Sequence, residues 1–237
     1  MGVVSMKAFR VFIGFDEKET VAYHVLSHSI QRHATVPVSI TPVMRSQVER
    51  LYTRPRGPLE STDFSMTRFL VPYLSNYEGH SLFLDCDMLC QSDIGEVFLY
   101  GLAFPDKAVQ VVQHDYVPKT ARKFLNQPQT AYHRKNWSSV MLFNNALCPQ
   151  LTPDYVNQAT GLDLHQFRWL KDEQIGDLPK EWNWLVDEYE PNATAKLLHY
   201  TLGTPCFTEY IHCAHADLWR DEFARMTTPL SLIAVYE

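Results

Sequence analysis

The chain has 237 residues, of which 46% are hydrophobic and 20% charged, and it carries a formal net charge of -6. This composition is ordinary for a soluble globular protein, and the length is sufficient to bury a sizeable core. The negative charge argues against nucleic-acid binding as the main function. Apolar runs stay short of the ~18 residues that a membrane span requires, so we expect no transmembrane segment.

The cysteines and the N-terminus give an expectation about the cellular compartment. The spacing of the five cysteines is not typical of a disulfide framework or a zinc site (Cys86, Cys90, Cys148, Cys206 and Cys213). The first six residues lack the basic start and long apolar core of a signal peptide. We therefore expect reduced cysteines and a cytoplasmic protein.

Apolar spacing predicts alternating strands and helices along the chain. In chain order, the first half is expected to hold strand 9–15, helix 19–32, strand 36–43, a short helix 46–51, loop 52–61, a helix from 63 to 74, strand 81–84 and helix 94–100. The second half is expected to hold strand 107–113, strand 140–143, helices 153–160 and 162–170, strand 196–200 and a closing helix 214–226. Between them, residues 114–136 form a polar and basic excursion that is either a mobile lid or a solvated loop.

This alternation predicts an α/β fold with a mainly parallel sheet and helices on both faces. We expect one domain over residues 1–237. Within it, residues of about 9–100 would form a nucleotide- and metal-binding half, residues of about 105–205 an acceptor-side half, and residues 206–237 a closing helix and tail.

The most informative stretch is the apolar run 81–84, which ends in Asp85 and Asp87 with Cys86 between them. Such a run is typical of a buried strand, and alternation would place both carboxylates on one face. Neighbouring carboxylates repel each other unless a cation lies between them. Because Mg2+ binds through a few carboxylates plus substrate phosphates, the pair predicts a divalent-metal site, and two solvated acids at a strand end are the alternative.

A further metal ligand is expected late in the chain. His199 follows an apolar run and precedes Gly203 and Pro205. Histidine is a common ligand of softer divalent ions, which favours Mn2+ over Mg2+. Nine other histidines are present, so a structural role for His199 is the alternative.

Six segments between residues 10 and 205 have a distinctive order and spacing: Val11 to Asp16, Ser65 to Phe69, Leu84 to Asp87, Trp137 to Asn144, Asp172 to Ile175 and His199 to Gly203. Together they resemble retaining, nucleotide-sugar-dependent glycosyltransferases of the GT-A fold, most closely glycosyltransferase family 8. Leu84 to Asp87 matches that family's Asp-x-Asp metal motif, and His199 to Gly203 resembles its late His-x-x-Gly element.

The resemblance implies a metal site, a donor site and an acceptor site. Asp85, Asp87 and His199 would hold Mn2+ or Mg2+ as a Lewis acid at the diphosphate. The donor nucleotide would contact Ile13, Phe15, Asp16, Arg68, Asp85, Cys86 and Gly203. The reacting sugar would lie near Arg68, Asp172, Glu173 and Gln174. The acceptor would meet Ser138 and Ser139. Apart from the resemblance, the aromatic stretch Trp182, Asn183 and Trp184 could stack on a sugar, so Trp182 and Asn183 are also assigned to the acceptor.

Simpler roles compete with some of these assignments. Arg68 could form a salt bridge on a helix surface, Asp16 could cap a helix N-terminus, and residues 172–174 could be a solvated loop. Aromatic residues such as Trp182 are more often part of a core.

The expected reaction moves a sugar from a nucleotide sugar to an acceptor. The resemblance implies that the donor nucleotide is UDP and that the anomeric configuration is retained. The acceptor is a lipopolysaccharide or capsule precursor, another glycan, a protein or a small molecule. A front-face route, in which the departing phosphate takes the acceptor's proton, is favoured because no carboxylate can be placed as a far-face nucleophile.

One departure concerns the phosphate site. The family usually has a lysine shortly after its late glycine, whereas Thr204, Pro205 and Cys206 follow Gly203 here. Thr204, a backbone amide or a basic residue from 119–135 would then hold the phosphate.

Two other functions are alternatives, and the sequence favours both less than a glycosyltransferase. A haloacid-dehalogenase-type phosphatase also has Asp-x-Asp after an apolar strand, but on its first strand and with different following residues. A non-catalytic nucleotide-sugar or carbohydrate-binding module would suit the tryptophans, although it does not need a metal at the leaving group.

Overall fold

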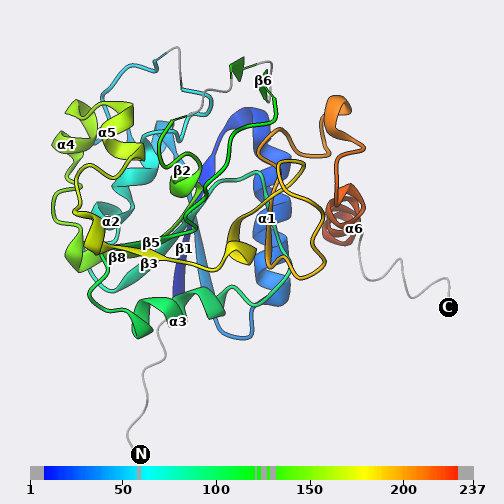
Figure 1. The fold of residues 1–237 in the computed structure, drawn as a ribbon, viewed down its shortest axis with the longest axis horizontal. Coiled ribbons are helices and arrows are strands. Elements are labelled where there is room, and N and C mark those ends of the chain that lie inside the picture. Colours follow the sequence, from blue (N-terminus) through cyan, green and yellow to red (C-terminus); the bar gives the residue numbers. More distant parts are fainter. Residues whose placement is uncertain (1–7, 58–59, 121, 124–126, 129–131, 229–237) are drawn as a thin grey trace, which may run out of the picture.

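The computed structural model describes residues 8–57, 60–120, 122–123, 127–128 and 132–228 (Figure 1). Its centre is a six-stranded sheet in the order β2-β1-β3-β8-β5-β9. The strands are β1 (Phe9–Phe15), β2 (Val38–Met44), β3 (His80–Leu84), β5 (Val109–Val111), β8 (Val140–Asn144) and β9 (Ile175–Asp177). Only β8 runs antiparallel to its two neighbours among these strands. The predicted mainly parallel α/β sheet is therefore confirmed.

A smaller sheet joins two distant parts of the chain. It consists of β10 (Trp184–Leu185), β11 (Leu197–His199) and β4 (Met88–Cys90), with β11 in the middle. Met88 pairs with His199 in an antiparallel register. Since Met88 directly follows the Asp85 to Asp87 turn, this pairing brings His199 to the acid pair. A separate hairpin pairs β6 (Arg122–Lys123) with β7 (Gln127–Pro128).

Helices cover both faces of the central sheet. The helices are α1 (Thr20–His33), α2 (Val71–Leu74), α3 (Gly95–Ala103), α4 (Pro153–Gln158), α5 (Gly161–His165) and α6 (Ala216–Thr227). Figure 1 shows α1 and α6 together on one side, with α2, α4 and α5 on the other. In α1, the buried Ala22, Val25, Leu26 and Ile30 follow helical spacing, which turns its apolar stripe toward the sheet.

The central strands are buried on both faces, so their sequences are continuous apolar runs rather than alternating ones. Residues 81–84 of β3 and 140–143 of β8 are all buried. The buried central strands therefore hold the turn that begins at Asp85 in a fixed position at the end of β3.

Two predicted helices differ from the structure. In place of a helix from 63 to 74, the chain forms a turn, a 3-10 helix over Thr67–Leu70 and the short α2. Pro72 lacks the N–H that a continuous helix would need there. The helix predicted over 162–170 ends at His165, and Phe167 has a positive φ of 56° that no α-helix accommodates.

Other expectations fall outside the described residues or concern the membrane. Residues 1–6, which were compared with signal peptides, and positions 121, 124–126 and 129–131 of the basic excursion are not among the described residues. In the described part of the chain, no helix has both the length and the apolar character needed to cross a membrane.

Candidate metal and donor site

A cavity of about 600 Å³ lies beside the turn that follows β3. Asp85, Asp87 and His199 line it together with Arg68, and its wall includes Ser138 and Ser139. Ligands in open α/β sheets commonly bind beyond the carboxyl ends of strands, and this cavity lies at such an end. Six residues predicted from widely separated segments therefore meet at one place.

Asp85, Asp87 and His199 form a compact set of potential metal ligands. One ligand atom from each lies within 4.8 Å of the others. His199 Nε2 is 3.3 Å from Asp87 Oδ1. Two carboxylates and an imidazole provide hard oxygen and softer nitrogen ligands, a combination that suits Mn2+. The residues present therefore fit a divalent cation.

The acid pair is presented differently from the prediction. β3 ends at Leu84, so Asp85 and Asp87 lie in a turn rather than on the strand itself. Both still line the cavity, whereas Cys86 between them is fully buried on the opposite side. The outcome matches the predicted alternation even though the strand does not extend that far.

A third carboxyl group lies behind the turn. The Cys86 thiol donates to Glu19 Oε2 over 3.7 Å, and Glu19 is itself buried. Burial raises the pKa of Glu19 well above its usual value, and the charges of Asp87, Asp16 and Asp85 raise it further. Burial likewise raises the pKa of the Cys86 thiol. This concentration of acidic groups favours a bound cation nearby.

Arg68 is buried in the cavity wall and is paired with Asp85. Its Nη1 lies 2.7 Å from Asp85 Oδ1 and donates to the Ser138 carbonyl at 2.9 Å. The guanidinium also lies over the rings of Phe64 and Phe83, at 5.2 and 5.0 Å from their centroids. With only 5% of Arg68 exposed, the alternative of a surface salt bridge does not hold.

Ser138 and Ser139 connect several of these groups. The Asp85 N–H donates to the Ser139 carbonyl at 3.0 Å, and Ser138 Oγ lies 2.7 Å from His165 Nδ1. On the far side, His199 Nδ1 lies 2.9 Å from Asn183 Oδ1, and Asn183 Nδ2 donates to Ser139 Oγ at 2.8 Å. The two serines thus hold the residues around the acid pair in place.

Three further lining residues were not predicted as site residues from the sequence. They are Lys135, Tyr132 and Arg54. Lys135 is buried, and its Nζ lies 5.2 Å from the centre of the Tyr132 ring. The pKa of Tyr132 is raised, because the effect of burial outweighs the opposing effect of the nearby Arg68 charge. The predicted basic excursion thus brings at least one lysine to the cavity, which its composition alone could not show.

Several predicted site residues are placed away from the cavity lining. Asp16 is buried, and its two carboxylate oxygens accept from the N–H groups of Lys18 and Asp63, both at 3.0 Å. It caps the 3-10 helix Glu17–Glu19, as the simpler alternative expected. The others outside the lining are Ile13, Phe15, Cys86, Gly203, Asp172, Glu173, Gln174, Trp182 and Asn183.

Two of these placements bear on the predicted roles. Asp172 has a side chain that is 81% exposed and pairs with Arg134 at 2.7 Å. Trp182 is 1% exposed, and the Lys196 ammonium lies 5.2 Å from its ring centre. Because its ring is enclosed, Trp182 offers no open face for sugar stacking in this conformation, and the core alternative describes it.

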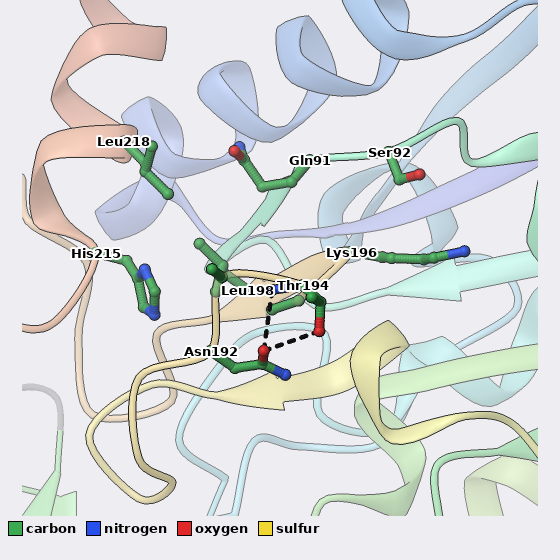
Figure 2. A pocket seen from close by; sticks show the side chains of 10 residues that line it. Gln91, Ser92, Asn192, Thr194, Lys196, Leu198, His215 and Leu218 are labelled. Atoms are coloured by element: carbon green, nitrogen blue, oxygen red, sulfur yellow. Dashed lines mark hydrogen bonds between the residues drawn. The ribbon is translucent and has the colours of Figure 1, made fainter.

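A second, smaller hollow of about 300 Å³ lies between α6 and the small sheet (Figure 2). Leu218 of α6 and His215 lie at one end, and the Lys196 side chain extends away from them at the other. Asn192 Oδ1 accepts from the N–H and the hydroxyl of Thr194, each at 2.9 Å. The acid pair does not line this hollow, so the larger cavity is the candidate functional site.

Comparison of the whole sequence finds a well-matched relative. The chain is 45% identical over 230 residues to Protein CDI of Arabidopsis thaliana, covering 93% of this chain and 88% of the relative. The chain belongs to the Protein CDI family. No family model matches the sequence.

Comparison with solved structures identifies the fold of the present chain, a member of the Protein CDI family. The bifunctional glycosyltransferase WbbM matches 99% of the chain with a TM-score of 0.65 and 18% identity. The glycosyltransferase GlyE of Streptococcus pneumoniae matches 96% with a TM-score of 0.60 and 14% identity. Galactosyltransferase LgtC matches 95% with a TM-score of 0.56 and 9% identity.

The coverage of these neighbours differs. The chain spans 52% of the WbbM chain and 62% of GlyE, but 99% of LgtC. At these identities the likeness concerns the architecture, which is of the GT-A type, as the resemblance implied.

Proposed function

We propose that this protein is a metal-dependent glycosyltransferase that moves a sugar from a nucleotide-sugar donor, a UDP-sugar by resemblance, to a glycan or other acceptor. The observation that carries the proposal is the convergence of Asp85, Asp87 and His199 on one point of a large cavity in a GT-A-type fold. The spacing of the three ligand atoms suits one divalent cation, with room beside it for a substrate.

The size of the cavity is consistent with a donor of this kind. Its volume of about 600 Å³ lies within the usual range of small-molecule sites, roughly 300 to 1,000 Å³. A bound Mn2+ or Mg2+ would act as a Lewis acid that neutralises the departing diphosphate. The chain's own contribution is to hold the ligands and to exclude water from the reacting centre.

Lys135 is our candidate for the basic group that contacts the diphosphate. It lines the same cavity as the metal-ligand trio and is buried, whereas no lysine follows Gly203. An ammonium group is a strong donor to phosphate oxygens. Thr204, one of the alternatives, is fully buried and bonds to Cys206 Sγ at 3.0 Å, which leaves it less suited to this role.

For the chemical step, we favour retention of configuration by a front-face route. The carboxylates in the cavity lining are Glu60, Asp85 and Asp87, and the last two belong to the metal-ligand set. Glu60 accepts from the Gly57 N–H at 2.9 Å. Asp172 and Glu173 are exposed outside the lining, and Glu60 is engaged by the Gly57 backbone, so we assign none of these carboxylates as a far-face nucleophile. The departing phosphate would then take the acceptor's proton.

The decisive experiment measures nucleotide release from a panel of nucleotide sugars with Mn2+, with Mg2+ and with chelator. Wild-type protein is compared with Asp87→Ala and with Asp106→Ala, a control at an acid whose side chain is 71% exposed. We expect one donor to be hydrolysed in a metal-dependent manner by the wild type and the control, and not by Asp87→Ala.

Calorimetry of UDP and of each nucleotide sugar in the panel with Mn2+ separates the remaining possibilities. Binding without turnover, including with an acceptor panel, would favour a nucleotide-sugar-binding module. Release of phosphate from phosphomonoesters would favour the phosphatase. Absence of both binding and turnover across the panel would contradict the proposal.

A further inference from the structure

The side of His199 that faces away from the cavity is held by a buried amide. His199 Nδ1 lies 2.9 Å from Asn183 Oδ1, and both residues are buried. Asn183 belongs to the 3-10 helix Lys180–Asn183, just before the small sheet that carries His199. It does not line the cavity, although the sequence suggested that it would contact the acceptor.

The hydrogen-bond directions in this cluster can be worked out from one carbonyl group. The Asn136 carbonyl can only accept, and Ser139 Oγ donates its single hydrogen to it at 2.7 Å. Ser139 Oγ must therefore accept from Asn183, whose Nδ2 is 2.8 Å away. The same Nδ2 also faces the Asn136 carbonyl at 3.4 Å, which independently places the amide NH2 on this side.

This orientation fixes the imidazole as well. With its NH2 toward Ser139, Asn183 presents its oxygen to His199, so Nδ1 must carry the hydrogen that it donates. In the neutral ring the lone pair is then on Nε2. Nε2 is the atom that lies 3.3 Å from Asp87 Oδ1, on the side where a cation would bind.

We propose that Asn183 is a positioning residue that holds His199 in the Nδ1–H tautomer, with Nε2 ready to bind a metal. The metal part of this inference rests on the proposed function, whereas the tautomer does not. Amide, carbonyl and carboxylate partners on the second ring nitrogen commonly orient metal-binding histidines in this way.

Ser139 extends the same support to the acid pair. Its hydroxyl accepts from Asn183, and its carbonyl accepts from the Asp85 N–H at 3.0 Å. A single residue thus connects the partner of His199 with the backbone of Asp85. We therefore assign Ser139 a positioning role in the same cluster, which keeps the two sides of the metal-ligand set in register.

The chain contains a closely matched control. Asn145 is also fully buried, and its Nδ2 donates to Ser81 Oγ and to the Glu78 carbonyl, both at 2.9 Å. Asn183 likewise donates to a serine hydroxyl and a backbone carbonyl. Asn145 does not line the cavity, and within the described residues its side chain bonds to Ser81 and Glu78 and to no histidine, so Asn145→Leu reports the loss of a buried asparagine alone.

The first measurement is the tautomer of His199 in metal-free protein, by nitrogen-15 NMR of the imidazole rings at pH 8. The His199 signals are assigned by their loss in His199→Gln. We expect the Nδ1–H pattern in the wild type and in Asn183→Asp, whose carboxylate can still accept from Nδ1. In Asn183→Leu, which keeps the volume but removes the acceptor, the tautomers should mix.

The second measurement is Mn2+ affinity by electron paramagnetic resonance, alongside the melting temperature. Loss of a residue that hydrogen-bonds to a metal ligand typically weakens metal binding by about 10- to 100-fold, and we expect such a loss for Asn183→Leu. Asn183→Asp should recover much of the affinity. Asn145→Leu should lower the melting temperature without changing Mn2+ affinity.

The outcomes separate this inference from the proposed function. An Nε2–H tautomer of His199 in the wild type would overturn the positioning role of Asn183, even if Asn183→Leu fails to fold. Equal losses of Mn2+ affinity in the Asn183→Leu and Asn145→Leu variants would also overturn it. If the wild type binds no Mn2+ but shows the expected tautomer, the positioning role of Asn183 stands and the metal-dependent function fails.

Discussion

Arg68 and Asp85 form a buried ion pair, 2.7 Å between Nη1 and Oδ1, at the end of the central strand β3. The guanidinium also donates to the Ser138 carbonyl and lies over Phe64 and Phe83. Arg68 therefore anchors Asp85 to both the sheet and the cavity wall. This relationship makes Arg68 a determinant of stability as well as of the site's geometry.

Arg68→Ala should lower the free energy of unfolding by about 3 kcal/mol, because removing one partner of a buried pair leaves the other charge uncompensated. Urea denaturation measures this effect. Arg56→Ala is the matched control, since Arg56 pairs with Asp63 where both side chains are about one-third exposed. Exposed pairs contribute about 0 to 1 kcal/mol, so equal losses in the two variants would contradict the assignment.

Lys135→Ala should weaken UDP binding by roughly tenfold in the presence of Mn2+, because a charge-assisted hydrogen bond to phosphate is worth about 1.5 to 3 kcal/mol. Isothermal calorimetry at two salt concentrations measures the change, and the variant should also show a weaker salt dependence. Lys196→Ala serves as the control, since Lys196 lines the separate hollow near α6 (Figure 2). Unchanged UDP affinity in Lys135→Ala would remove Lys135 from the phosphate site.

Mn2+ should raise the melting temperature of the wild type, since a ligand at 100 times its Kd stabilises the folded state by about 2.7 kcal/mol. Asp87→Asn should lose this response. In chelator, however, the variant should melt higher than the wild type, because the neighbouring carboxylates of Asp85 and Asp87 repel each other when no cation lies between them. Scanning calorimetry with and without Mn2+ tests both statements, and a variant that still responds fully to Mn2+ would argue against Asp87 as a ligand.

The contact between α6 and α1 should depend on pH. Glu222 of α6 is 2% exposed and accepts hydrogen bonds from Arg32 and His28 of α1. Burial raises the pKa of its carboxyl, but these hydrogen bonds outweigh burial, so the pKa is lowered overall. A lowered folded-state pKa means that the stabilisation is present above the unfolded-state pKa and is lost as pH falls through the folded-state value.

Glu222→Gln should therefore lower the free energy of unfolding by about 1.5 kcal/mol at pH 7, because hydrogen bonds to a charged group are lost. The difference from wild type should shrink below the usual glutamate pKa of about 4.5. Urea midpoints measured across the acid range test this. A difference that grows toward acid pH would show that the sign is opposite.

Much of the fold could be predicted because its strongest signals are local. The apolar runs of β1 and β3 and the helical spacing in α1 each specify an element without reference to distant residues. The Asp85–Asp87 pair was found because it follows the apolar run of β3. His199 was found because it lies at the end of a short apolar run and matches the late His-x-x-Gly element of the resemblance. Their convergence in one cavity, together with Arg68, agrees with the order and spacing of the segments.

The remaining features depend on tertiary contacts. The strands β4, β9 and β10 have only two or three residues each, too few for a periodic pattern. Segment 63–74 has the apolar spacing of one helix, but Pro72 has no N–H for the hydrogen bond that a continuous helix would need. Burial of Phe64 and Leu70 accounts for the apolar residues without a single helix. Asn183 was predicted to meet a sugar, whereas its hydrogen-bond partners come from distant positions that no sequence pattern could reveal.

The pairing of β4 with β11 also has a consequence for how the protein folds. Asp87 and His199 are separated by nearly half of the chain, and their approach requires the register in which Met88 pairs with His199. Contacts between such distant segments form slowly, because closing a long loop costs entropy before the contacts offset it. Metal binding should accordingly appear late during refolding, which would make Mn2+ uptake a kinetic signal that the two halves of the chain have joined.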